Sequence, residues 1–142
     1  MARTMYETEA NLEKERAVVA LICEKFKCTS DKLAIKYGLD YALSRDGKVA
    51  AFCEIKCRNY PFSHFADGYA IGLHKIMAAK QLTDTTGLPF ILVISCEDGV
   101  YYTKVSEFKN ILTVMGGRRD RGDPQDIEPM AVFRAAEFKK IV

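Results

Sequence analysis

The sequence has no tryptophan, only two histidines, and no CxxC pair among its five cysteines. Without a CxxC pair, the two histidines His64 and His74 cannot complete a zinc site of standard spacing, which argues against a zinc-finger protein. An odd number of cysteines without a disulfide pattern is typical of reduced thiols in the cytosol. We therefore expect a cytoplasmic protein that does not depend on disulfide bonds.

Long apolar segments and a large excess of one charge are also missing. The longest apolar run, Pro89–Ile94, is much shorter than the roughly 18 residues that mark a membrane-spanning helix, and we expect no membrane partner. The first residues, Met1–Arg3, are followed by glutamates rather than by the apolar core of a signal peptide. The net charge of +2 excludes a protein that holds nucleic acid by bulk charge alone, but it leaves room for a local basic surface.

The order of predicted elements favours an α/β fold with one mixed sheet flanked by helices. We expect one domain over residues 1–142, with a core over about 5–105 and a C-terminal extension over 106–142. The residue patterns predict helices over Thr4–Phe26 and Tyr69–Thr83, strands over Leu33–Leu43, Val49–Cys57, Phe90–Ser95, Val100–Val105 and Ile111–Met115, and a return to the sheet at Met130–Arg134.

Two charged residues fall on the apolar faces of the predicted helices. At helical spacing, Glu15 lies at the centre of the apolar stripe of the first helix, and Lys75 lies in the middle of that of the second. A buried carboxylate costs several kcal/mol unless it has a partner. The structural alternatives are a glutamate at a frayed helix end, paired with a lysine, and a lysine that buries its stem and extends its ammonium into water.

The predicted hairpin over residues 33–57 has one charged face. The odd-numbered positions of both strands are apolar and fit a core, whereas Asp40, Glu54, Lys56 and Arg58 occupy even-numbered positions. Side chains two residues apart on a strand emerge on the same side, so Glu54 and Lys56 share a face. The structural alternative is a solvated hairpin face with an ordinary ion pair.

The turn between the two strands decides whether Asp40 joins that face. A two-residue turn would place Asp40 opposite Cys53 and away from Glu54. A three-residue turn over Arg45–Gly47, with the glycine in the left-handed conformation, places Asp40 opposite Phe52 and diagonal to Glu54. We predict the three-residue turn, because it keeps both odd-numbered faces on one core.

Two carboxylates with a lysine two residues along are a chemically meaningful arrangement. Carboxylate oxygens suit a hard divalent ion such as Mg²⁺ or Mn²⁺. Such an ion polarises a phosphoryl oxygen and lowers the pKa of a bound water. A lysine beside it can hold that water or offset the charge of a pentavalent phosphate.

These residues resemble the PD-(D/E)XK nuclease superfamily. The resemblance is carried by Glu15 on the first helix, Asp40 on a strand, and the apolar-flanked segment Ala50–Lys56, which contains the ExK triplet. The order of these features is most similar to small Holliday-junction-resolvase-like and phage-encoded nucleases. The chain departs from the motif at Leu39, where the pattern has proline. The resemblance implies a restriction-endonuclease-like αβββαβ core, over Glu15 to about Thr103.

The resemblance also implies roles for individual residues. It implies a Mg²⁺ or Mn²⁺ site made by Asp40, Glu54, the backbone carbonyl of Ile55, and Glu15. It implies that Lys56 acts on the attacking water and that Lys75, on the second helix, lies beside the scissile phosphate. Gln81 is an alternative for the second-helix role, but helical spacing places it off the face that carries Lys75.

Six further residues are candidates for contact with nucleic acid. Arg58, Tyr60 and His64 follow the ExK strand and could touch phosphate or stack on a base. Arg118, Arg119 and Arg121 lie in a glycine-rich segment that could clamp phosphate, although a solvated loop explains them equally well.

The expected function is a metal-dependent nuclease that hydrolyses phosphodiester bonds of DNA, with endonucleolytic cleavage. If the chain is phage-encoded, it is expected in the host cytoplasm, and two copies are expected to pair where a duplex must be spanned. One alternative is a nuclease-fold module that has lost catalysis and serves in DNA binding or assembly. Another is an unrelated α/β protein whose charged hairpin is structural.

Overall fold

The computed structural model describes residues 9–33, 39–106, 112–117 and 127–141. The helices are α1 (Glu9–Phe26) and α2 (Leu73–Thr86), with short 3₁₀ turns η2 (Phe62–Phe65) and η4 (Ala135–Glu137). The strands are β1 (Thr29–Lys32), β2 (Tyr41–Arg45), β3 (Lys48–Cys57), β4 (Tyr69–Gly72), β5 (Phe90–Cys96), β6 (Gly99–Val105), β7 (Leu112–Gly117), β8 (Ile127–Phe133) and β9 (Lys139–Lys140).

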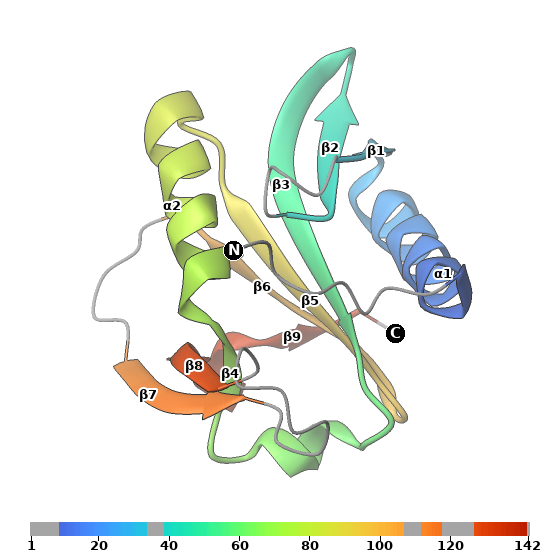
Figure 1. The fold of residues 1–142 in the computed structure, drawn as a ribbon. Helices are drawn as coiled ribbons and strands as arrows, with labels where there is room; N and C mark the ends of the chain where they lie inside the picture. The colour runs from blue at the N-terminus through green and yellow to red at the C-terminus, as the bar shows by residue number, and fades with distance from the viewer. Residues whose placement is uncertain (1–8, 34–38, 107–111, 118–126, 142) are drawn as a thin grey trace.

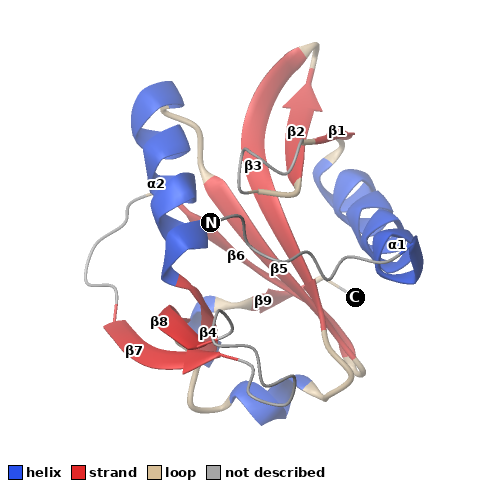
Figure 2. Cartoon of the chain, in the orientation of Figure 1, coloured by secondary structure: helices blue, strands red, loops and turns tan. Residues whose placement is uncertain are grey.

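A mixed six-stranded sheet forms the centre of the molecule, in the order β1-β2-β3-β5-β6-β9 (Figure 1). The β3 and β5 strands pair in parallel, and the other neighbours pair antiparallel. The two helices lie on opposite sides of this sheet (Figure 2). The predicted α/β class with helices flanking a mixed sheet is confirmed. Within the described residues, neither helix has the length and apolar character that crossing a bilayer would require.

The sheet separates two apolar clusters. Odd-numbered residues of β3 and β5, such as Cys53 and Val93, pack with Ile22 of α1. Even-numbered residues of β5, such as Leu92, pack with Ile76 of α2. Because β5 lies in the middle, all residues from Phe90 to Ile94 are buried, as the apolar run predicted.

The predicted second helix divides into a strand and a helix. The segment over Tyr69–Gly72 is the strand β4, and α2 begins only at Leu73. The predicted start at Tyr69 is therefore wrong. In β4 both Tyr69 and Ile71 are buried, because the strand pairs with β8. That partner lies far along the chain, and helical spacing alone could not reveal it.

The predicted strand over Leu33–Leu43 is also corrected. Thr29–Lys32, between the predicted helix and the predicted strand, forms β1, and β2 begins only at Tyr41. Part of the predicted strand, residues 34–38, lies outside the described residues, as do residues 1–8 at the predicted start of the first helix.

The C-terminal part does not simply return to the central sheet. The predicted strand at Met130–Arg134 corresponds to β8, which is the middle strand of a second, three-stranded sheet in the order β4-β8-β7. The short strand β9 is the one that joins the central sheet, beside β6. Strand β7 agrees with the predicted strand over Ile111–Met115, apart from residue 111, which is outside the described residues.

The hairpin between β2 and β3 has a two-residue turn, so the predicted three-residue turn is wrong. Arg45 pairs with Lys48, and the turn residues Asp46 and Gly47 both have positive φ angles, 55° and 77°. Two positive φ values define the type I′ turn, whose twist matches that of the flanking strands. Aspartate followed by glycine is a favoured sequence for this turn.

A β-bulge then restores the face that the turn alone would have changed. Ser44 pairs with Val49, but Leu43 pairs with Ala51, so Ala50 is the extra residue. Tyr41 therefore pairs with Cys53. Continued by one residue, this register brings Asp40 opposite Glu54 rather than Phe52. The predicted pairing of Asp40 with Phe52 is therefore wrong, and Asp40 instead contacts the backbone of Cys53 and Ile55, on either side of Glu54.

The turn gives a direct test of the backbone conformation. A Cβ atom added at Gly47 would meet nothing within 4 Å, so only the left-handed conformation should oppose a side chain there. We expect Gly47→Ala to lower the free energy of unfolding by about 1 kcal/mol. Gly47→Asn should lose less, because asparagine tolerates this conformation better. Urea unfolding measures both values, and equal losses would contradict the conformational explanation.

Candidate active site

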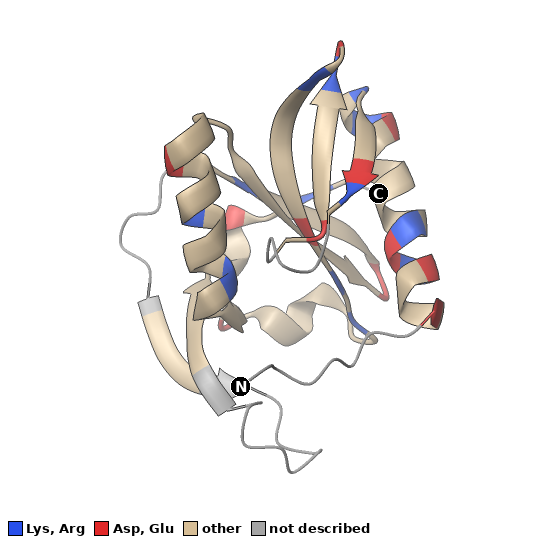
Figure 3. Ribbon diagram, turned by 45° about the horizontal axis from the view of Figure 1, so that its top comes forward, with Lys and Arg blue, Asp and Glu red and all other residues tan. Residues whose placement is uncertain are grey.

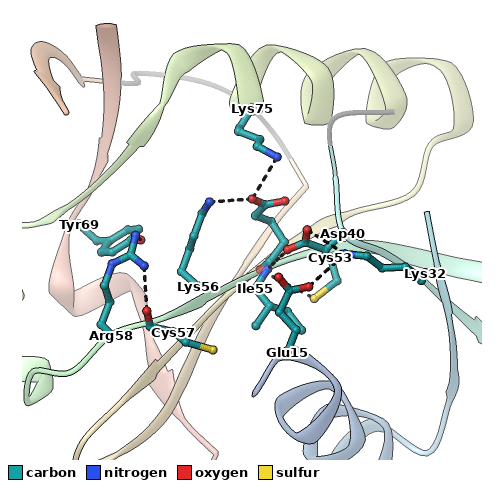
Figure 4. Close-up of polar contacts among 11 residues, drawn as sticks. Glu15, Lys32, Asp40, Cys53, Ile55, Lys56, Cys57, Arg58, Tyr69 and Lys75 are labelled. Carbon is teal, nitrogen blue, oxygen red and sulfur yellow. Dashed lines mark hydrogen bonds and ion pairs between the residues drawn. The ribbon is translucent and has the colours of Figure 1, made fainter. Parts of the chain in front are cut away.

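Glu54 is a buried carboxylate on the face of the central sheet that carries α2. Its side chain is 1% exposed. One carboxylate oxygen, Oε2, lies 3.0 Å from Nζ of Lys56 and 3.4 Å from Nζ of Lys75 (Figure 4). The other oxygen, Oε1, is buried and has no hydrogen-bond partner in the part of the chain that the structure describes.

Burying a charged carboxylate in this way costs folding free energy. A buried carboxylate needs charged or hydrogen-bonding partners, and Glu54 has two cations on one oxygen only. Native structures leave few buried polar atoms unpaired, and those that exist call for an explanation. An oxygen that lacks a donor in a cluster of charges is available to a cation. This makes Glu54 the centre of the candidate site.

Lys56 and Lys75 approach Glu54 from two different elements. Lys56 follows Glu54 by two residues on β3, and Lys75 comes from the first turn of α2. Both side chains are half-buried. Burial alone lowers the pKa of the Lys56 ammonium, but the charge of Glu54 and the hydrogen bond to it outweigh burial and raise that pKa above its ordinary value. Lys56 is therefore a firmly protonated cation at neutral pH.

Asp40 lies directly beside Glu54, just before β2 begins. Its backbone N–H donates to the carbonyl of Cys53 at 3.2 Å, and its Oδ2 accepts from the N–H of Ile55 at 2.9 Å. These two bonds flank Glu54 on the neighbouring strand. The Asp40 carboxylate thus takes the place of a backbone acceptor at the end of the β2–β3 ladder. Its position is fixed by the backbone of the ExK segment itself.

Lys32 connects Asp40 to the first helix. Its Nζ lies 3.1 Å from Oε1 of Glu15 and 3.4 Å from Oδ1 of Asp40. Glu15 is mostly buried, and it points from α1 toward this cluster (Figure 4). Glu15 therefore reaches Asp40 through a lysine that the sequence analysis did not select. Lys32 was missed because the residue pattern predicts no element at this position, whereas it belongs to the edge strand β1.

The site combines three carboxylates with three lysines. The carboxylates are those of Glu15, Asp40 and Glu54, and the lysines are Lys32, Lys56 and Lys75. Both helices that flank the sheet also carry basic positions (Figure 3). Among the described residues, no three His, Cys, Asp or Glu side chains are close enough together to form a metal site by themselves. Lysine ammonium groups separate the acids instead.

The donor chemistry nevertheless fits a hard divalent cation. Asp40 and Glu54 supply carboxylate oxygens, which Mg²⁺ and Mn²⁺ prefer. The buried Oε1 of Glu54 lacks a donor within the described residues, and it is the atom best suited to receive a cation. Lysines that now neutralise the acids are flexible and half-buried, so they can turn away.

The predicted nucleic-acid contacts fall in different places. Arg58 continues the face of Lys56 beyond β3, and its Nη2 donates to the hydroxyl of Tyr69 at 2.9 Å. Its guanidinium also lies over the Tyr69 ring, at 5.7 Å from the centroid. Tyr60 is exposed in the loop that precedes η2. Arg118, Arg119 and Arg121 lie outside the described residues.

Tyr69 is a second residue that the sequence analysis missed. Burial raises the pKa of its phenol above the ordinary value, although the cations of Arg58 and Lys56 act in the opposite direction. The hydroxyl therefore stays protonated at neutral pH and orients Arg58. A buried tyrosine before the second helix was interpreted as part of that helix, so its position on β4 was not foreseen.

Comparison with known proteins agrees with the fold and with the motif. A family model described as "Phage putative PDDEXK endonuclease" matches residues 1–141. No match was found among curated proteins. The match includes the C-terminal strands, about which the motif residues said little. The predicted resemblance is confirmed, and the chain belongs to this family of phage PDDEXK endonucleases.

Proposed function

We propose that this protein is a divalent-metal-dependent endonuclease that hydrolyses phosphodiester bonds of DNA. PDDEXK nucleases typically use divalent metals, and the family supports a nuclease. The observation that carries the proposal for this chain is the buried Glu54 carboxylate, with two lysines on one oxygen and no hydrogen-bond donor from the described residues on the other. In a purely structural ion pair, we would expect the second buried oxygen to have a hydrogen-bond partner as well.

The metal would be held first by Asp40 and Glu54, with Mg²⁺ or Mn²⁺ as the ion. Glu15 and the backbone carbonyl of Ile55 would complete its ligands. The N–H of Ile55 already binds Asp40, so both acids are fixed to the same stretch of β3. When bound, such an ion supplies a polarised phosphoryl oxygen and a water of lowered pKa.

The lysines provide the remaining positive charge. The Lys56 ammonium would hold the attacking water and offset the charge that develops on the phosphate. Lys75 would contact the scissile phosphate from α2. Arg58 is oriented by Tyr69 for a phosphate farther along the strand. We also propose that two copies of the chain pair to span a duplex.

One prediction of this proposed function concerns Glu54→Gln, which keeps the shape of the side chain but removes its charge. Cleavage of DNA in Mg²⁺ should fall by about 10²–10³ or more, because the metal loses its best buried ligand. DNA binding should persist or tighten, since a negative charge is removed from the site that receives the phosphate. Plasmid nicking and fluorescence anisotropy measure the two effects.

Glu24→Gln is the matched control for that variant, because Glu24 is an exposed glutamate on α1. It should cleave as the natural protein does, and EDTA should abolish cleavage in both. Full activity of Glu54→Gln would place the catalytic site elsewhere. Absence of cleavage by the natural protein, with DNA binding intact, would favour the catalytically inactive binding module.

The second prediction concerns Lys75→Met, which keeps an unbranched side chain and removes the ammonium. If Lys75 lies beside the scissile phosphate, the rate at saturating DNA should fall by about 10²–10³. Lys80→Met is the control on the same helix, since Lys80 is exposed and pairs with Asp84 one turn away. Single-turnover cleavage measures both, and equal rates for the two variants would make Lys75 a packing residue.

A further inference from the structure

Tyr60 and His64 form an exposed stacked pair of aromatic rings. Their ring centroids are 4.2 Å apart and their planes differ by 12°. Tyr60 is 46% exposed, and His64 is exposed as well. Each ring covers one face of the other, and the opposite face of each ring lies outside the stack. Single exposed aromatic residues are ordinary, but a parallel pair open to solvent is a ready surface for a third flat ring.

The pair is mounted rigidly. The ring of Phe65 lies nearly perpendicular to both rings, at centroid distances of 6.5 Å to Tyr60 and 5.2 Å to His64. The carbonyl of Tyr60 accepts from the N–H of Glu97 at 2.9 Å, and the N–H of Phe62 donates to Oδ1 of Asp98 at 2.9 Å. Both partners belong to the turn between β5 and β6. The loop is therefore tied to the central sheet, and little conformational entropy would be lost when a ligand binds.

Ring contacts and a hydrogen bond lead from this pair to Arg58, two residues beyond Lys56. Phe65 packs against Tyr69 at a centroid distance of 5.0 Å, and Tyr69 holds Arg58. Phe65 also packs against the apolar cluster on the α2 side of the sheet, the side that carries Lys56. Tyr60 follows Lys56 by four residues, so their Cα atoms are at most about 14 Å apart. The pair is therefore within reach of a DNA strand held at the active site.

A stacking surface selects among DNA structures. In an intact duplex the base faces are covered by neighbouring pairs, so only an unpaired base can offer its face to an aromatic ring. The chain has a net charge of only +2, so bulk charge cannot supply most of the affinity for DNA. Local stacking next to oriented cations can supply it for a single strand.

We propose that Tyr60 and His64 form a base-stacking platform and that the substrate carries unpaired nucleotides next to the bond that is cleaved. Arg58 would hold a phosphate between the platform and the active site. The inference rests on the proposed nuclease function, since it names the class of DNA that the same site accepts. It adds a recognition element that lies outside the cluster of acids and lysines.

Binding measured without cleavage is the first test. Fluorescence anisotropy in EDTA compares a blunt duplex with the same duplex carrying a single-stranded extension. The natural protein should bind the extended form more tightly, and Tyr60→Leu should reduce that binding by about tenfold. Tyr60→Phe keeps the ring and should keep the preference. Equal weakening for both DNAs, or none, would overturn the proposal.

A second variant and a parallel cleavage assay separate the two proposals. His64→Leu removes the other ring and should have the same effect, so the test stands even if Tyr60→Leu fails to fold, which thermal melting would show. If the natural protein cleaves DNA but both leucine variants keep its preference among substrates, the platform fails and the nuclease function stands. If the natural protein selects unpaired DNA through Tyr60 but cleaves none, the platform stands and the nuclease function fails.

Discussion

The arrangement of the site depends on keeping one carboxylate ionised inside the protein. Glu54 is shielded from water, and the ammonium groups of Lys56 and Lys75 compensate its charge. Removing both lysines would leave an uncompensated buried charge, which is far more costly than losing an exposed ion pair. The positions of β3 and of the start of α2 are therefore coupled through a single oxygen atom. The packing of α2 on the sheet therefore also sets the position of the Lys75 ammonium beside Glu54.

The wider cluster is balanced in formal charge. Three acids, Glu15, Asp40 and Glu54, are linked to three lysines, and Lys32 bridges two of the acids. Without a metal, this balance lets the acids lie close together despite their mutual repulsion. A divalent cation bound among them would make the balance positive. The lysines would then be free to face the negative charges of a nucleic acid backbone.

The sequence allowed much of this site to be predicted, because charge at apolar positions is visible in the residue pattern. Glu54 and Lys56 were assigned to one face by the period of two, and Lys75 stood out on an apolar helix face. The residues that the sequence did not reveal depend on long-range pairing. Lys32 lies at an edge strand, and Tyr69 lies on β4 because of a partner some 60 residues later in the chain. The bulge at Ala50 could not be predicted either. It reverses the change of face that the two-residue turn would otherwise cause, so it leaves no trace in the alternation of apolar residues.

The pairing of β4 with β8 gives the C-terminal strands an influence on the site although none of the described site residues lies there. Gly72 ends β4 and is followed directly by α2, so the register of Tyr69–Gly72 against Met130–Phe133 sets the direction in which the helix leaves the sheet. Lys75 lies in the first turn, where a small rotation of the helix about its axis would carry its ammonium away from Glu54. The C-terminal strand β8 thus holds the second helix in its orientation. Sequence changes in β8 would therefore alter the orientation of α2 and, with it, the position of the Lys75 ammonium.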